Sequence, residues 1–360
     1  MQRPRFRPRG LATAIGSMPH TDPDEACRVV LRFLPEIPAW PQLPNRSFVE
    51  NMYFQFRPSF LPGLTQEVDG RFHIDLSENF SEGLERLYAD YLKNDCDRYE
   101  IKADRRAGLD AFLKAFPAGE LGKRLAIKGQ VTGPVSWGLT VADERSQRPL
   151  IYDEIVADAI AKSLKLQAAW QERVLGKLCS NTIIFVDEPY MASFGSAFVS
   201  LSRAKVAALF EEVFGGLTGL KGVHCCGNTD WSVLLDSSLD ILSVDAYNYG
   251  ETLGLYPAEV RRFLARGGVI AWGIVPSDEE ALVRQGVDSL LERLEALFGY
   301  LKGKGIPQEE LLQQCLITPS CGLGSLSLAG AVRALELVEG VSAKFRKLYH
   351  GVEVDAIRRC

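Results

Sequence analysis

The chain lacks three features that would place it in special classes of protein. None of its apolar runs approaches the length of about 18 residues that crosses a bilayer. It has no basic excess, because 41 Lys and Arg face 46 Asp and Glu in 360 residues, which argues against a general nucleic-acid binder. It also has no short repeat, low-complexity tract or flexible linker. With a hydrophobic fraction of 46%, we expect one large globular domain with no membrane or nucleic-acid partner.

The amino terminus has little apolar length. The stretch Leu11–Ile15 is followed at once by Gly16, Ser17 and Pro19, so it is too short for the core of a signal peptide. We therefore expect residues 1–10 to form a flexible basic arm and the protein to be cytoplasmic. The eight cysteines are then expected to be free thiols or metal ligands rather than disulfides.

Short apolar runs alternate with amphipathic stretches along the chain, which is typical of parallel βαβ units. The expected strands are 11–15, 125–131, 182–186, 222–226, 241–244, 269–275 and 315–318, and the expected helices are 22–33, 152–178, 202–214, 231–235, 257–264, 279–301 and 326–348. Seven or eight units suit a (β/α)8 TIM barrel over residues 11–350. The segment 41–71, rich in Pro, Phe and Asn, fits poorly and is expected to be an N-terminal insertion or a hairpin.

The active site of such a barrel lies at the carboxyl ends of its strands. The polar residues that end the expected strands are therefore candidates: Ser17, Gln130, Thr132, Asp187, Glu188, His224, Cys226, Asp245 and Cys321. His224 and Cys226 project to one face of their strand and Cys225 to the other. With Cys321, and with Asp245 as a possible oxygen ligand, they predict a zinc site. Each has a plain alternative, because a buried His–Cys pair or a Cys before Gly can be packing alone.

Ligands spread over nearly 100 residues indicate a catalytic site rather than a zinc finger, whose ligands come in local pairs. A zinc ion with thiolate ligands is poorly suited to making hydroxide from water. It can bind an incoming thiol and hold it as a thiolate at neutral pH, which activates the sulfur as a nucleophile. The residue chemistry therefore favours alkyl transfer to a thiol.

The motifs resemble those of the superfamily of cobalamin-independent methionine synthases, uroporphyrinogen decarboxylases and zinc-dependent corrinoid methyltransferases. The resemblance runs through nearly the whole chain and rests on five segments: 14–19 (AIGSMP), 131–135 (VTGPV), 185–189 (FVDEP), 224–226 (HCC) and 319–323 (PSCGL). The last two match the zinc motifs and are the most specific.

The resemblance implies metal-binding or substrate-binding roles for seven residues. His224, Cys226 and Cys321 would bind Zn²⁺. Ser17 and its loop would hold the amino-acid end of homocysteine, and Asp187, the candidate catalytic residue, would meet its amino group. Glu188 and Glu50 would be further substrate-binding acids. The alternative for Asp187 and Glu188 is a pair of acids that caps the next turn, and for Gly16 and Ser17 it is a plain turn.

The chain departs from the synthases in three respects. It has Asp245 where they have a Glu ligand. The segment 226–229 (CGNT) is more like the corrinoid methyltransferases. Full-length synthases also have two barrels in roughly twice this length, so the methyl donor is either methyltetrahydrofolate or a methylated corrinoid protein. Two other functions stay open: a uroporphyrinogen decarboxylase-like enzyme, and a non-catalytic, zinc-stabilised partner of a corrinoid protein.

Overall fold

A computed structural model describes residues 6–61, 63–66, 72–76, 80–116, 124–196 and 199–351. The first five residues of the predicted basic arm lie outside this part of the chain. At the end of the arm, the backbone amides of Arg9 and Gly10 donate to the carbonyls of Gln313 and Cys315 at 3.1 and 2.7 Å. None of the described helices has the length and apolar character needed to cross a membrane.

The centre of the fold is a curled, seven-stranded sheet in which every neighbouring pair is parallel. The strand order is β1–β10–β9–β8–β7–β6–β4. Their bounds are β1 Leu11–Ala12, β4 Ile127–Thr132, β6 Thr182–Asp187, β7 Leu220–Cys225, β8 Ile241–Val244, β9 Val269–Val275 and β10 Cys315–Pro319. Each strand overlaps an expected apolar run, because a parallel strand is covered on both faces and needs apolar residues on both.

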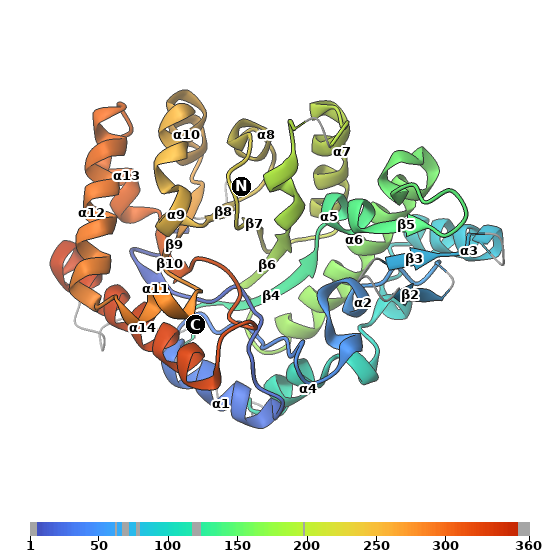
Figure 1. The fold of residues 1–360 in the computed structure, drawn as a ribbon, viewed down its shortest axis with the longest axis horizontal. Coiled ribbons are helices and arrows are strands. Elements are labelled where there is room, and N and C mark those ends of the chain that lie inside the picture. The colour runs from blue at the N-terminus through green and yellow to red at the C-terminus, as the bar shows by residue number, and fades with distance from the viewer. Residues whose placement is uncertain are drawn as a thin grey trace.

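A helical segment follows each strand and covers the outer face of the sheet (Figure 1). The main helices are α1 Pro23–Phe33, α6 Glu154–Gly176, α7 Arg203–Phe214, α8 Trp231–Leu235, α10 Pro257–Ala265, α12 Val287–Gly303 and α14 Leu328–His350. Figure 1 shows α7, α8, α10 and α12 along one side of the strands and α14, α1 and α4 (Ala107–Lys114) along the other. The parallel sheet and its crossover helices agree with the expected α/β class.

One expected helix is divided in two. The prediction of a single helix over 279–301 is wrong, because α11 spans Glu279–Val283 and α12 begins at Val287. Asp278 caps α11 by accepting from the Ala281 amide at 2.8 Å. Gly286 then adopts an extended conformation (φ −124°, ψ 171°) and caps α12. The apolar periodicity continues across this break and hides it.

An eighth strand is not formed among the described residues. In its place, a segment that contains Ala39 and Gln42 joins the two edges of the sheet through isolated β-bridges, Ala39 to Lys128 and Gln42 to Ser17. Its amides donate to the neighbours on both sides, Trp40 to the Lys128 carbonyl at 3.2 Å and Gln42 to the Gly16 carbonyl at 3.0 Å. Pro38 and Pro41 have no amide hydrogen to donate, so a regular ladder cannot form here.

The poorly fitting segment 41–71 adds structure beside the main sheet. It contains η1 (Phe48–Glu50), α2 (Met52–Gln55) and β2 (Leu64–Gln66), and β2 pairs antiparallel with β3 (Phe72–Ile74). With β5 (Val141–Asp143) these strands form a separate three-stranded sheet. The other helices are α3 Phe80–Leu92, α5 Pro134–Thr140, α9 Ala246–Tyr249, α13 Gln308–Gln313, η2 Asp97–Tyr99, η3 Ala103–Arg105, η4 Leu150–Tyr152, η5 Pro189–Ser193 and η6 Gly250–Leu255.

The buried apolar side chains form two clusters that alternate along the strands. Ile184, Val186 and Leu242 pack toward the helices in the larger cluster. Ile183 and Phe185 belong to the smaller cluster with side chains from the other strands, inside the curl of the sheet. This alternation carries the residues at the strand ends either into the interior or toward the helices.

Candidate active site

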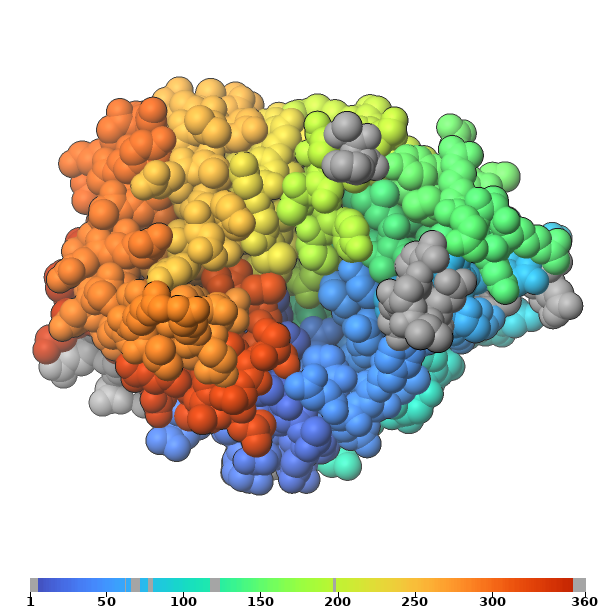
Figure 2. Space-filling view, in the orientation of Figure 1, coloured from blue at the N-terminus to red at the C-terminus, as the bar shows by residue number. Residues whose placement is uncertain are grey.

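A cavity of about 430 Å³ lies at the carboxyl ends of the strands. Figure 2 shows the surface hollowed where the blue N-terminal residues meet the orange and red residues of the C-terminal part. Of the eight residues to which the sequence analysis gave a metal or substrate role, six line this cavity: Ser17, Glu50, Asp187, His224, Cys226 and Cys321. Residues as far apart in the sequence as Ile15 and Ser325 therefore line one cavity.

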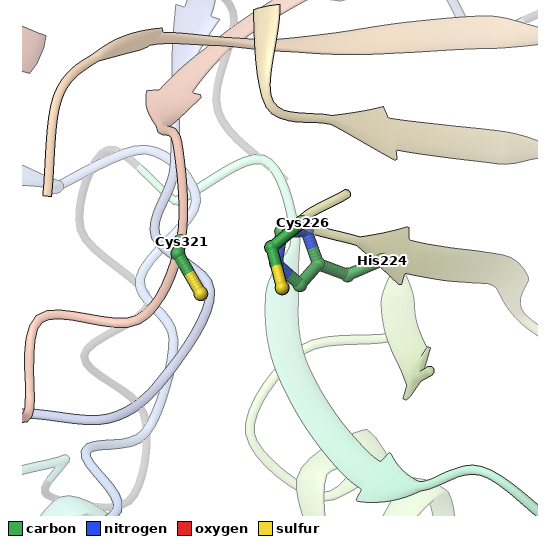
Figure 3. Close-up of side chains that lie close together, drawn as sticks. All are labelled: His224, Cys226 and Cys321. Atoms are coloured by element: carbon green, nitrogen blue, oxygen red, sulfur yellow. The ribbon is translucent and has the colours of Figure 1, made fainter. Parts of the chain in front are cut away.

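The predicted metal ligands lie together in this cavity. One ligand atom from each of His224, Cys226 and Cys321 lies within 4.8 Å of the others. His224 is at the end of β7, Cys226 follows that strand, and Cys321 lies in the loop after β10. Figure 3 shows the Cys321 side chain facing the other two across the cavity. His224, Cys226 and Cys321 therefore lie together, as expected from their positions at the ends of strands.

The His224 ring is oriented for a ligand. Its Nδ1 lies 3.0 Å from the hydroxyl of Ser243 on β8, while Nε2 is buried without a hydrogen-bond partner. Zn²⁺ accepts one imidazole nitrogen and two thiolates, and a hydrogen bond to the other ring nitrogen fixes the orientation of such a ligand. The donor set and the unpartnered nitrogen therefore fit Zn²⁺ with three protein ligands.

The three cysteines of this region have different surroundings. A hydrogen bond with Cys321 and the nearby His224 lower the pKa of Cys226. The same hydrogen bond, together with burial, raises the pKa of Cys321. Cys225 points to the other face of the strand into the core, where burial raises its pKa to about 12. Cys226 is thus the member of the adjacent pair that favours the thiolate form.

The carboxylate of Asp245 is used elsewhere. It ends β8 close to His224, but its two oxygens accept from the backbone amide and the side-chain amide of Asn248 at 2.9 and 2.8 Å. Asp245 thereby caps α9, and it does not belong to the group of three ligand atoms.

Asp187 presents a buried acceptor to the cavity. It ends β6, and its Oδ1 is buried without a hydrogen-bond partner. Burial raises the pKa of Asp187, and the positive charge of Lys128 opposes this shift. Lys128, on β4, donates to the Ile15 carbonyl at 2.5 Å and to Gln130 Oε1 at 3.2 Å. Our sequence analysis missed this lysine, although a charge inside an apolar strand was a usable signal.

Glu50 presents a second such acceptor. Its Oε1 pairs with Arg46 at 2.6 Å, while Oε2 is buried without a partner. Burial raises the pKa of this carboxyl, and the contact with Arg46 opposes the shift. Asn51 and Met52, which follow it, also line the cavity. Asn51 and Met52 belong to the segment 41–71, whose sequence pattern did not predict that they line the cavity.

The Ser17 loop is held against the Cys321 loop by close backbone approach. The Ser17 carbonyl accepts from the Leu323 amide at 2.9 Å. A Cβ at position 322 would lie 2.0 Å from Ser17 Oγ, and Gly16, at φ +150°, passes so close to Gln130 that a Cβ would lie 2.6 Å from it. Position 16 therefore requires glycine, and a side chain at position 322 would displace the Ser17 hydroxyl.

Glu188 turns away from the cavity. It is fully buried, and its oxygens accept from the Val135 amide at 3.0 Å and from the amide and hydroxyl of Ser136 at 2.7 and 2.6 Å. These contacts cap the start of α5, where Gly133 offers no side chain. Burial raises the pKa of Glu188 to about 7, and its hydrogen bonds to Ser136 and Val135 oppose the shift.

We expect Glu188→Ala to lower the free energy of unfolding by about 2–4 kcal/mol, because three donors lose their acceptor in a buried site. Glu188→Gln should cost less, since its amide oxygen still accepts from Ser136. Urea denaturation measures both, with Glu280→Ala on the exposed face of α11 as the control, expected within about 0.5 kcal/mol of the unmodified chain. A variant at position 188 with normal stability but lost thiol binding would instead support the predicted substrate role.

Comparison with known proteins identifies only a shared fold. No protein-family model and no curated protein sequence matches the chain. A B12-independent methionine synthase from Shewanella sp. W3-18-1, solved with selenomethionine, superposes with a TM-score of 0.57 at 15% identity, over 95% of this chain and 99% of that one. A methyltransferase from Methanosarcina mazei superposes with a TM-score of 0.51 at 14% identity, over 89% and 86% of the two chains.

Proposed function

We propose that the chain is a zinc-dependent methyltransferase that transfers a methyl group to the thiol of homocysteine and so forms methionine. The observation that carries the proposal is one cavity that combines three metal-ligand atoms within 4.8 Å of one another with two unpartnered carboxylate oxygens. A methionine synthase and a methyltransferase are among the solved structures of this fold, which supports the reaction class.

The metal would be held by His224 Nε2 and the two thiolates of Cys226 and Cys321. When bound, Zn²⁺ supplies a charge that keeps a substrate thiol deprotonated at neutral pH. Ser243 keeps the imidazole aimed at the site through its contact with Nδ1. Cys226 and Cys321 are free thiols, and a reducing compartment such as the cytoplasm would keep them available as ligands.

The substrate ammonium would bind between Asp187 and Glu50. Each presents a buried carboxylate oxygen with no partner, and such an atom is costly unless a ligand supplies a donor. The described lining of the cavity contains no Lys or Arg. A lining with carboxylates and without cations suits an amino thiol. It does not favour a porphyrinogen, whose many carboxylates would need cations.

The Ser17 loop would complete the substrate site. Gly322 passes close to Ser17, and the Leu323 amide donates to the Ser17 carbonyl, so this loop lies against the Cys321 loop. The amino-acid end of the substrate and its sulfur would therefore be held on one frame. In-line transfer gains most of its rate from such positioning. We propose methyltetrahydrofolate or a methylated corrinoid protein as the donor.

The test begins with zinc, measured by elemental analysis on protein purified under reducing conditions. We expect about one zinc per chain, and methionine formation from homocysteine with either methyltetrahydrofolate or methylcobalamin as the methyl source. Removal of zinc with a chelator should abolish transfer, and re-addition should restore it. A chain that takes up no zinc when it is offered, or that holds zinc and methylates no thiol with either donor, would contradict the proposal.

A further inference from the structure

A second, smaller cavity lies beside α2 and is lined by cations. Its volume is about 120 Å³, and it lies between the end of α2 and the segments η2 and η3. Arg57, Arg98, Lys102 and Arg105 line it, with Glu100 as the one acid of the described lining. Glu100 pairs at 3.0 Å with Arg106, which lies outside the lining, and at 4.0 Å with Lys102, which belongs to it. The cavity therefore holds an excess of positive charge.

The two arginines at the inner side of this cavity have little anionic pairing, because Asp104, on a mostly exposed side chain, is the one acid beside them among the described residues. Among the described residues, the half-buried Arg57 guanidinium has no hydrogen bond or ion pair. Burial and the nearby charge of Arg105 lower the pKa of Arg57, and the negative charge of Asp104 opposes this shift. The Nε of Arg105 is buried without a hydrogen-bond partner, and its ion-pair partner Asp104 lies 3.5 Å away on a mostly exposed side chain. Two like charges held together in a recess are stabilised by an anion between them.

A neutral side chain adds a hydrogen-bond acceptor to the same cavity. Gln167, from α6, lines it and is only 6% exposed. Its Nε2 donates to the Arg57 carbonyl at 3.0 Å, which fixes the amide orientation, and its Oε1 is buried without a partner. A ligand that satisfies all of these groups needs anionic oxygens for the arginines and a hydroxyl hydrogen for Gln167. Hydrogen phosphate has both, and so does the monoanion of a phosphate monoester, which the site would have to select from the dianion that predominates above about pH 6. Sulfate and simple carboxylates at neutral pH lack the hydrogen.

We infer that this cationic cavity is a binding site for a phosphoryl group that carries a hydroxyl, held by Arg57, Arg105 and Gln167. The ligand is either free phosphate or the phosphate monoester of a larger molecule. The inference does not depend on methyl transfer, because it rests on residues outside the thiol cavity.

The new site is joined to the thiol cavity through two glutamines. Gln42 lines the thiol cavity and donates to Gln55 Oε1 at 2.7 Å. Gln55 lines the cationic cavity and donates to the Arg105 carbonyl at 2.7 Å, and Arg105 in turn donates to the Phe54 carbonyl at 2.6 Å. A ligand on Arg105 would therefore steady α2, whose first residue, Met52, lines the thiol cavity.

Isothermal titration calorimetry of the full chain at constant ionic strength tests the inference. We expect saturable binding of one inorganic phosphate per chain, at least about tenfold tighter than sulfate, because sulfate has no hydrogen for Gln167. Arg57→Gln should weaken phosphate binding by at least about tenfold. Arg86→Gln, an exposed arginine of α3 paired with Glu82, is the control and should bind phosphate normally. Glycerol 3-phosphate distinguishes the two sources, since tighter binding than phosphate identifies a monoester and weaker binding identifies the free ion.

Arg98→Gln gives a second variant that does not risk the fold, since Arg98 is exposed, and it should also weaken binding. Circular dichroism and thermal unfolding show whether each variant is folded. Equal, weak heats for phosphate, sulfate and chloride, unchanged by Arg57→Gln and Arg98→Gln, would overturn the site. Sulfate that binds as tightly as phosphate would overturn the assignment to a phosphoryl hydroxyl.

Discussion

Replacement of Cys226 by alanine is expected to raise the dissociation constant for Zn²⁺ by more than about 100-fold and to abolish methyl transfer. Loss of an outer-shell partner of a metal site commonly costs 10- to 100-fold in affinity, and loss of one of three direct ligands should cost more. A chromophoric chelator that competes for the metal measures the constant. Elemental analysis after dialysis gives an independent value.

The neighbouring cysteine supplies a matched control for this experiment. Cys225 is fully buried in the core on the opposite face of β7, so Cys225→Ala should keep zinc and activity. Cys225→Ala should lower the free energy of unfolding by about 1 kcal/mol, because part of a small buried side chain is removed. If both variants retain zinc equally well, or both lose it, the proposed assignment of the adjacent cysteines to opposite roles is wrong.

The main sheet was predictable because burial on both faces makes each strand a nearly continuous apolar run. The expected runs 241–244 and 269–275 coincide with β8 and β9. Two features escaped the same reasoning. The break at Gly286 leaves the helical periodicity intact on both sides, and the segment between the sheet edges contains Pro38 and Pro41, which leave only isolated bridges.

The site was predictable to the extent that it lies at strand ends. His224, Cys226 and Asp187 end or follow neighbouring parallel strands, so topology alone brings them together. The surroundings of Glu50 were harder to predict from the sequence. The segments η1 and α2 are held by contacts with distant parts of the chain, and no periodic apolar pattern marks them. Lys128 was missed because its role depends on the Ile15 carbonyl, more than 100 residues away.

Asp187 and Glu188 show a further limit of sequence reasoning. The two acids are adjacent, and either could face the substrate. The backbone at Glu188 (φ −126°, ψ 65°) leaves the strand conformation, so Asp187 keeps the interior direction of β6 while Glu188 turns to α5. The direction of the second side chain therefore depends on the start of a helix more than 50 residues earlier in the chain.

The second large effect is expected for Asp187→Asn, which keeps the shape of the side chain and removes its charge. If Asp187 binds the substrate ammonium, kcat/KM for homocysteine should fall by roughly 30- to 150-fold, or about 2–3 kcal/mol. A thiol of the same length without the amino group, 4-mercaptobutanoate, should react equally with the unmodified chain and the variant. The ratio of kcat/KM for the two thiols separates loss of recognition from general damage to the site.

Asp245→Asn is the matched control, because it makes the same chemical change after β8, two strands from β6 in the sheet. Asparagine is also a good helix cap, so α9 should persist, and zinc, activity and the preference for homocysteine should all be kept. Loss of zinc in Asp245→Asn would show that this carboxylate reaches the metal after all, as its place in the sequence suggested. Unchanged discrimination in Asp187→Asn would remove Asp187 from substrate recognition and leave Glu50 Oε2 as the remaining unpartnered carboxylate oxygen in the described lining.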